Sequence, residues 1–210
     1  VNSVYGTATL SYANKIFLDV TGRNDWSSTL PSGNNSFFYP SVSTSFILSD
    51  LLRLPEQISF AKLRASWAQV GNDTAPYKTA KYYNTSAFPG SASVSPTLYN
   101  ARFKPEISNS IEVGLDWRMF KQRFGLDLAF YNNITRNQIL DVPMDQTTGY
   151  TKATMNSGKV RNRGIELQLD GTPVKTKNFT WNSTFTWAKN YNKVLSLAAG
   201  LTDGQTIAYT

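Results

Sequence analysis

The chain contains neither cysteine nor histidine, and both absences exclude classes of function. Without these side chains the sequence offers no zinc site of the usual kind, no thiol nucleophile and no Ser-His-Asp triad. Disulfide bonds cannot stabilise the fold, so an oxidising compartment is neither supported nor excluded. We therefore predict no metal, no cofactor and no enzymatic activity.

Charged residues are also scarce. They make up 17% of the 210 residues, against about 25% in ordinary soluble domains. Hydrophobic residues reach 40% and aromatic residues 13%, while Asn, Ser and Thr supply much of the polarity. No apolar run approaches the roughly 20 residues that a membrane-spanning helix needs, so helical spanning is excluded.

The net charge of +7 raises the possibility of a nucleic-acid partner. The 21 Lys and Arg are scattered, however, and no run of four or more occurs anywhere. We therefore predict no nucleic-acid binding and expect the excess charge to be spread over loops and turns.

Eight segments have the composition and alternation of β-strands: 3–12, 15–24, 37–49, 58–70, 108–120, 123–133, 158–172 and 178–190. Most exceed the five or six residues of an average strand and suit the 9–11 tilted residues that cross a bilayer. Pro40 should lie at a strand end or an irregular position. The alternation slips in 58–61, which suggests a bulge. A short stretch near 193–199 is the only candidate helix.

The connections alternate in length along the chain. Short ones fall near 13–14, 50–57, 121–122 and 173–177, and long ones at 25–36, 71–107 and 134–157. Membrane barrels have short periplasmic turns and long extracellular loops, whereas a soluble sandwich has no reason to place its long loops at one end. We predict an all-β fold, an antiparallel transmembrane β-barrel segment of about eight strands.

Period-two alternation gives each strand an apolar and a polar face. We predict that the apolar face meets lipid and that the polar face lines the lumen. The side chains of that wall either contact substrate or a plug, or only form hydrated ion pairs. The candidate lumen-facing residues are Asp19, Arg23, Lys62, Arg64, Glu112, Asp116, Arg118, Asp127, Glu166, Gln168 and Asp170.

Aromatic residues near both ends of the strands predict an interfacial girdle. Its candidates are Tyr12, Phe17, Trp67, Trp117, Phe124, Trp181 and Trp187. The longest connection contains Tyr77, Tyr82, Tyr83 and Tyr99, which either stack on substrate or pack the loop onto its neighbours.

Four phrases resemble one known family: GRNDWSSTLP (22–31), KLRASWAQVGND (62–73), FKPEISNSIEVGLDWR (103–118) and MNSGKVRNRGIELQLDG (155–171). In this order they resemble the SusC/RagA-type TonB-linked outer-membrane proteins of Bacteroidetes. The resemblance implies a barrel of roughly 22 strands with a plugged lumen. It also implies TonB-driven import of large nutrients, oligosaccharides or peptides, and a SusD-like surface lipoprotein over the barrel.

On this interpretation residues 1–210 are part of one TonB-dependent receptor barrel domain in the outer membrane. The chain starts without Met, so we expect it to be a segment of a longer protein. The resemblance implies that a plug domain and a signal peptide lie outside it. A passive porin or adhesin-like barrel would share every pattern above. An outer-membrane hydrolase and a soluble carbohydrate-binding sandwich are further alternatives.

Overall fold

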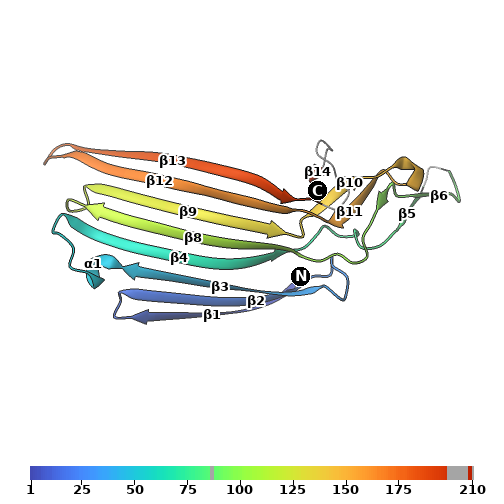
Figure 1. The fold of residues 1–210 in the computed structure, drawn as a ribbon, viewed down its shortest axis with the longest axis horizontal. Helices are drawn as coiled ribbons and strands as arrows, with labels where there is room; N and C mark the ends of the chain where they lie inside the picture. The colour runs from blue at the N-terminus through green and yellow to red at the C-terminus, as the bar shows by residue number, and fades with distance from the viewer. Residues whose placement is uncertain (86–87, 198–207, 210) are drawn as a thin grey trace.

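A computed structural model describes residues 1–85, 88–197 and 208–209, and its main feature is one antiparallel sheet (Figure 1). The order of its eight strands is β1-β2-β3-β4-β8-β9-β12-β13. Their bounds are Asn2–Tyr12, Ile16–Trp26, Ser36–Ile47, Ile58–Asn72, Glu106–Met119, Phe124–Arg136, Lys159–Lys175 and Thr180–Ser196. Within the described residues β1 and β13 each pair with one strand, so the sheet stays open.

All eight predicted strands are confirmed. The expected bulge also occurs, because the register between β4 and β8 shifts between Ile58 and Phe60. Pro40 lies inside β3 opposite Gly22, and pairing with β4 begins at the next residue, Ser41. The candidate helix near 193–199 is wrong for 193–196, which continue β13, while 198–199 lie outside the described residues.

Connections at one end of the sheet are short. Residues 13–15 join β1 to β2 through a turn in which Lys15 N donates to Tyr12 O at 2.9 Å. Ala13 and Asn14 both have positive φ, at 51° and 55°, which matches the right-handed twist of the two strands. The longer connection at this end holds α1 (Leu48–Leu51). We call this edge the short-turn end.

The opposite end carries the long connections, and they are folded rather than structureless (Figure 1). The β4–β8 connection contains β5 (Tyr83–Thr85), β6 (Ala92–Val94) and β7 (Thr97–Leu98). The β9–β12 connection contains β10 (Ile139–Pro143), the turn η1 (Gln146–Thr148) and β11 (Lys152–Asn156). A second sheet joins β14 (Ala208–Tyr209), β10, β11 and β7. The sequence did not predict these strands.

The small hydrophobic core lies at this loop end. Leu30, Phe103 and Ile139 pack together with Phe37 against them, and Phe103 is fully buried. Each of these residues comes from a different connection or strand end, so the core ties the loops to one another. Among the described residues no helix is long and apolar enough to cross a membrane.

Candidate functional site: the polar face of the sheet

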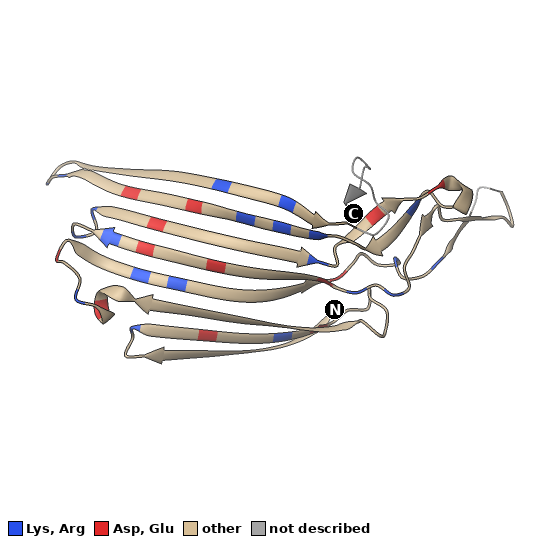
Figure 2. Ribbon diagram, viewed as in Figure 1, with Lys and Arg blue, Asp and Glu red and all other residues tan. Residues whose placement is uncertain are grey.

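The structure places all eleven candidate lumen-facing residues on one face of the sheet. Residues opposite one another in an antiparallel register share a face. Asp19 is opposite Ser43, Ser43 opposite Ser66, and Ser66 opposite Glu112. The same pairing relates Asp127 to Gln168 and Asp116. Charged residues of both signs therefore share one surface, which we call the polar face, and Figure 2 shows that both signs occur along the strands of the sheet.

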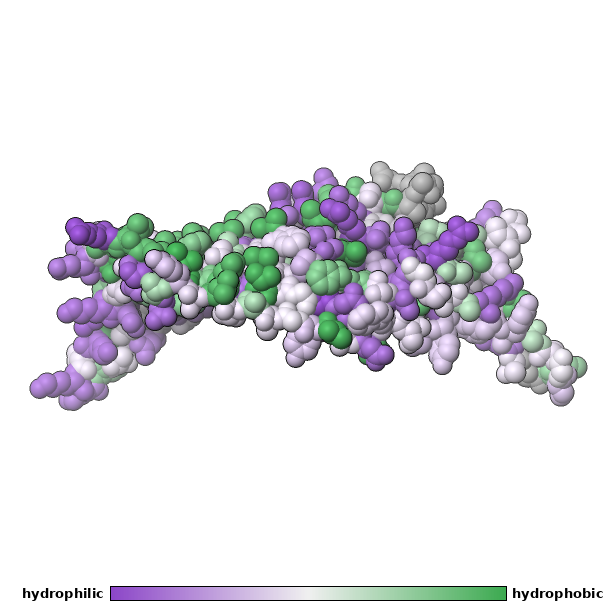
Figure 3. Space-filling model, turned by 90° about the horizontal axis from the view of Figure 1, so that it is seen from below, coloured by the Kyte–Doolittle hydropathy of each residue, from purple (hydrophilic) through white to green (hydrophobic). Residues whose placement is uncertain are grey.

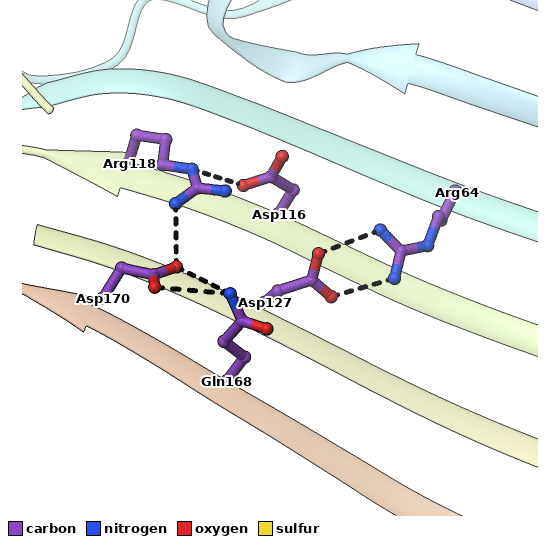
Figure 4. A network of polar contacts seen from close by, with 6 residues as sticks. All are labelled: Arg64, Asp116, Arg118, Asp127, Gln168 and Asp170. Carbon is purple, nitrogen blue, oxygen red and sulfur yellow. Dashed lines mark hydrogen bonds and ion pairs between the residues drawn. The ribbon is translucent and has the colours of Figure 1, made fainter. Parts of the chain in front are cut away.

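An arginine reaches across a whole strand on this face. Arg64 of β4 donates to Asp127 of β9, with Nη2–Oδ1 and Nη1–Oδ2 distances of 2.9 and 3.3 Å (Figure 4). Between them on β8 lies Gly114, directly opposite Arg64. A Cβ at Gly114 would lie 2.3 Å from Arg64 Nε. An alanine at this position would force the Arg64 side chain to move, because the guanidinium occupies the space of the added Cβ.

The same arrangement recurs one strand further along. Arg118 of β8 lies over Gly125 of β9, where a Cβ would be 2.2 Å from Nη1. Its Nη1 donates to Asp170 Oδ2 of β12 at 3.3 Å, and its Nε lies 2.9 Å from Asp116 Oδ1. Gln168 donates to Asp170 as well, at 3.0 Å (Figure 4). Asp116 and Asp127 face each other directly, so the arginines offset a repulsion between like charges.

Tyr131, an uncharged residue of β9, also reaches over a glycine to a partner two strands away. Its ring lies over Gly164 of β12, and Asn190 Nδ2 of β13 donates to its hydroxyl at 3.1 Å. Tyr131 was not among the residues predicted to line the lumen, although its phase on β9 matches that of Asp127.

Two hollows open on the polar face between these side chains. The larger, about 480 Å³, is lined by residues that include Arg64, Glu112, Glu166 and Gln168. The smaller, about 230 Å³, is lined by residues that include Asp19, Lys62 and Arg64. Arg64 therefore contributes to both hollows. Among the described residues no group of three or more carboxylates could hold a metal ion.

Arg23 lies in a separate cluster near the loop end. Its Nε donates to Asp25 Oδ1 at 2.8 Å. Its guanidinium carbon Cζ lies over the Tyr39 ring, 5.9 Å from the ring centroid. Tyr39 also donates to the buried Asp25, at 2.5 Å. Arg23 thus shares the polar face with the Arg64 network but is bound to other partners.

The opposite face carries the aliphatic and aromatic side chains, and we call it the apolar face. Leu128 lies between Leu115 and Leu167, and many side chains of this face are more than a third exposed. Hydrophobic side chains gather between more polar ends of the molecule (Figure 3). Uncovered apolar surface of this extent marks an interaction with lipid or protein.

Six of the seven girdle candidates share the apolar face: Tyr12, Trp67, Trp117, Phe124, Trp181 and Trp187. Placing Phe17 with them is wrong. Phe17 is opposite Ser45 and Ser11 and two residues from Asp19. A side chain in that phase points to the polar face.

The four loop tyrosines separate into two kinds. Tyr82 and Tyr99 stack on each other, with centroids 5.6 Å apart and hydroxyls 3.1 Å apart. Tyr77 and Tyr83 are 83% and 64% exposed, and Lys81 Nζ lies 6.0 Å from the Tyr83 ring. Tyr77 and Tyr82, with Ala80, line an apolar hollow of about 340 Å³. Packing onto a neighbour therefore accounts for Tyr82 and Tyr99 but not for the two exposed rings.

The whole chain, residues 1–210, matches the family described as TonB dependent receptor-like, beta-barrel. It belongs to that family. TonB-dependent receptor P26 of Formosa agariphila is 33% identical over 206 residues, which are 94% of this chain and 21% of that receptor. TonB-dependent receptor SusC of Bacteroides thetaiotaomicron is 25% identical over 219 residues, with the same two coverages. The chain thus spans about a fifth of the length of these relatives.

Solved structures agree on the fold of this TonB-dependent receptor barrel segment. The RagAB peptide transporter superposes with a TM-score of 0.87 at 24% identity, over 95% of this chain and 23% of that one. The siderophore receptor PirA from Pseudomonas aeruginosa superposes with a TM-score of 0.61 at 17% identity, over 91% of this chain and 34% of that receptor. Barrels of this family are outer-membrane proteins, and both likenesses confirm the antiparallel barrel architecture expected from the sequence.

Proposed function

We propose that residues 1–210 form part of the wall of an outer-membrane importer that takes up large nutrients. Energy would come through TonB, and a SusD-like lipoprotein would cover the loop end. The observation that carries the proposal is the division of one sheet into a face that is apolar over the middle of its strands and a polar face lined with ion pairs. Membership of the TonB-dependent receptor family supports active import.

The polar face suits a hydrated path for oligosaccharides or peptides. Its charges are of both signs and largely paired with each other, as in Arg64–Asp127 and Arg118–Asp170. Such a wall offers hydrogen-bond donors and acceptors to hydroxyl and peptide groups. Peptide uptake gains weight from the RagAB peptide transporter, which shares the fold.

Exposed rings at the loop end are the candidate first contacts with substrate. Tyr77 and Tyr83 are largely exposed to solvent, and Tyr offers large contact area at little cost in conformational entropy. Sugar rings and aromatic or proline side chains of peptides would both stack on such surfaces.

The test uses the full-length protein in its native host. Uptake of a fluorescent oligosaccharide and of a fluorescent peptide of equal mass is measured in wild-type cells and in a gene deletion, with and without a protonophore. We expect one of the two probes to be taken up only when the gene is present and the protonophore is absent. Uptake that depends on the gene but ignores the protonophore would instead identify a passive porin.

A matched pair of variants then tests the loop contacts. Tyr77→Ala/Tyr83→Ala should raise the half-saturating probe concentration several-fold, while Val94→Ala, exposed in the same connection, should not. If the tyrosine variant matches wild type, these rings do not contact substrate. Purification of the full-length protein from native membranes tests the partner, and the absence of any SusD-like lipoprotein from the purified material would remove that part of the proposal.

A further inference from the structure

Six cations gather on the apolar face at the loop end. They are Arg136 of β9, Lys159, Arg161 and Arg163 of β12, and Lys189 and Lys193 of β13. Their phase matches that of Ile165 and Leu128, and the register sets Arg161 opposite Lys193 and Ile165 opposite Lys189. Most of the blue bands on β12 and β13 fall toward this end (Figure 2). We call these six residues the basic patch.

The basic patch lacks counter-ions in the described part of the chain. None of the six forms an ion pair with a described carboxylate, in contrast to the paired arginines of the polar face. Arg161 Nε is buried and has no acceptor among the described residues. Gathered cations without acidic partners are electrostatically unfavourable on their own, so this surface is complementary to an anionic ligand.

A hollow beside the patch combines cations with apolar walls. Its volume is about 210 Å³, and it is lined by Phe130, Ile165 and Tyr191 together with Arg163, Gly164 and Lys189. The Arg163 guanidinium lies 5.3 Å from the centroid of the Tyr191 ring, so a cation–π contact holds it over the aromatic surface. A ligand that fits this site carries a negative group joined to a hydrocarbon part.

The height of the patch agrees with a lipid headgroup region. The stretch from Trp181 to Lys189 rises about 20 Å, at about 3.4 Å per residue and a tilt of about 40°. The apolar band of an outer-membrane barrel is about 25 Å tall and is flanked by aromatic girdles. Trp181 would lie at one boundary of that band, and Trp187 and Lys189 near the other.

We propose that the basic patch binds the phosphate groups of a lipid in the outer leaflet, with the lipid's acyl chains against Phe130 and Ile165. The proposal rests on the proposed function only in requiring that the loop end be extracellular and the apolar face meet lipid. Its position on the face opposite the polar wall separates it from any path of substrate. Arg163 and Lys189 line the hollow and are the central contacts.

The test uses purified full-length protein in detergent micelles and native mass spectrometry. The probes are monophosphoryl lipid A and the same glycolipid without its phosphate. The variant is Arg163→Gln/Lys189→Gln. The matched control, Lys175→Gln/Lys177→Gln, removes the same charge at the short-turn end. A cation near an anionic headgroup contributes about fivefold in binding, so the variant should lose more than tenfold in affinity for the phosphorylated lipid.

The control should bind this lipid like wild type, and the dephosphorylated lipid should bind equally weakly to all three proteins. Equal binding of both glycolipids, or equal loss in both variants, overturns the proposal. Displacement of the lipid by millimolar inorganic phosphate also overturns it, because the site would then recognise free phosphate. Nutrient uptake by the Arg163/Lys189 variant is measured in parallel, so failure of the lipid site is distinguished from failure of the importer.

Discussion

Arg64 and Asp127 lie on strands that do not touch, yet their charged groups meet at 2.9 Å over an intervening strand. The contact is possible because Gly114 leaves the path of the guanidinium clear. Arg118 over Gly125 and Tyr131 over Gly164 follow the same rule. Each such bridge couples three strands on the polar face, where a cross-strand pair would couple only two.

Gly114→Ala should therefore destabilise the barrel by about 1–3 kcal/mol, the usual cost of overpacking. The added Cβ displaces Arg64 and breaks its contact with Asp127. In an Arg64→Ala background the same substitution should cost close to nothing, so a double-mutant cycle on urea unfolding in lipid vesicles isolates the effect. Gly6→Ala, whose Cβ meets nothing within 4 Å, is the control. Equal costs of Gly114→Ala with and without Arg64 would show that the glycine serves another purpose.

Leu128→Arg should cost about 2–4 kcal/mol in a bilayer, because Leu128 lies in the middle of the apolar face. Thr186→Arg introduces the same side chain opposite Gln168 on the polar face and should be close to neutral. Unfolding in vesicles measures both. If the two variants lose the same stability, the assignment of the faces to lipid and lumen is wrong.

Phe103→Ala should loosen the loop end by about 3–5 kcal/mol, the usual cost of removing a fully buried aromatic side chain. The loss should be local, because Phe103 packs on Leu30 and Ile139 from other connections. Limited proteolysis should show faster cutting in 73–105 and 137–158 with the strands of the large sheet intact. Phe120→Ala, half exposed in a turn at the other end, should leave the cutting pattern unchanged.

Asp141, in the loop sheet, should make that sheet sensitive to acid. Burial raises the pKa of Asp141, but hydrogen bonds from Lys152 at 2.5 Å and Thr154 at 2.6 Å outweigh it and lower the pKa below its ordinary value of 3.8. A lowered folded-state pKa stabilises the fold above the ordinary value, and this contribution is lost as the pH falls through the folded pKa. Hydrogen exchange in β10 and β11 should therefore be less protected at pH 3 than at pH 5.5.

Asp141→Asn should remove most of that pH dependence and cost about 1–3 kcal/mol locally at neutral pH, as expected for a buried hydrogen-bonded carboxylate. The control is Asp145→Asn. Backbone and side-chain hydrogen bonds from Thr147 lower the pKa of Asp145, but Asp145 is exposed. Any change in hydrogen exchange caused by Asp145→Asn should therefore be confined to η1. Unaltered acid sensitivity in Asp141→Asn would assign the effect to another group.

Strand content and the partition of residues between two faces followed from the sequence, because a period of two is a local property of the chain. All eight long strands and the shared face of Glu112, Asp127 and Gln168 were predicted on that basis. Phe17 lies two residues from Asp19 and so shares its face, and the girdle assignment of Phe17 was wrong because closeness to a turn does not change the face on which a side chain lies.

Only the tertiary structure decided which residues meet. Register between strands depends on the full ladder of pairings, so neither the Arg64–Gly114–Asp127 bridge nor the sharing of Arg64 by two hollows could be derived from spacing. The small sheet at the loop end was equally hidden. Its strands are only two to five residues long, too short for periodicity to distinguish, and they are held by contacts such as Thr97 with Lys152 that lie far apart in the chain.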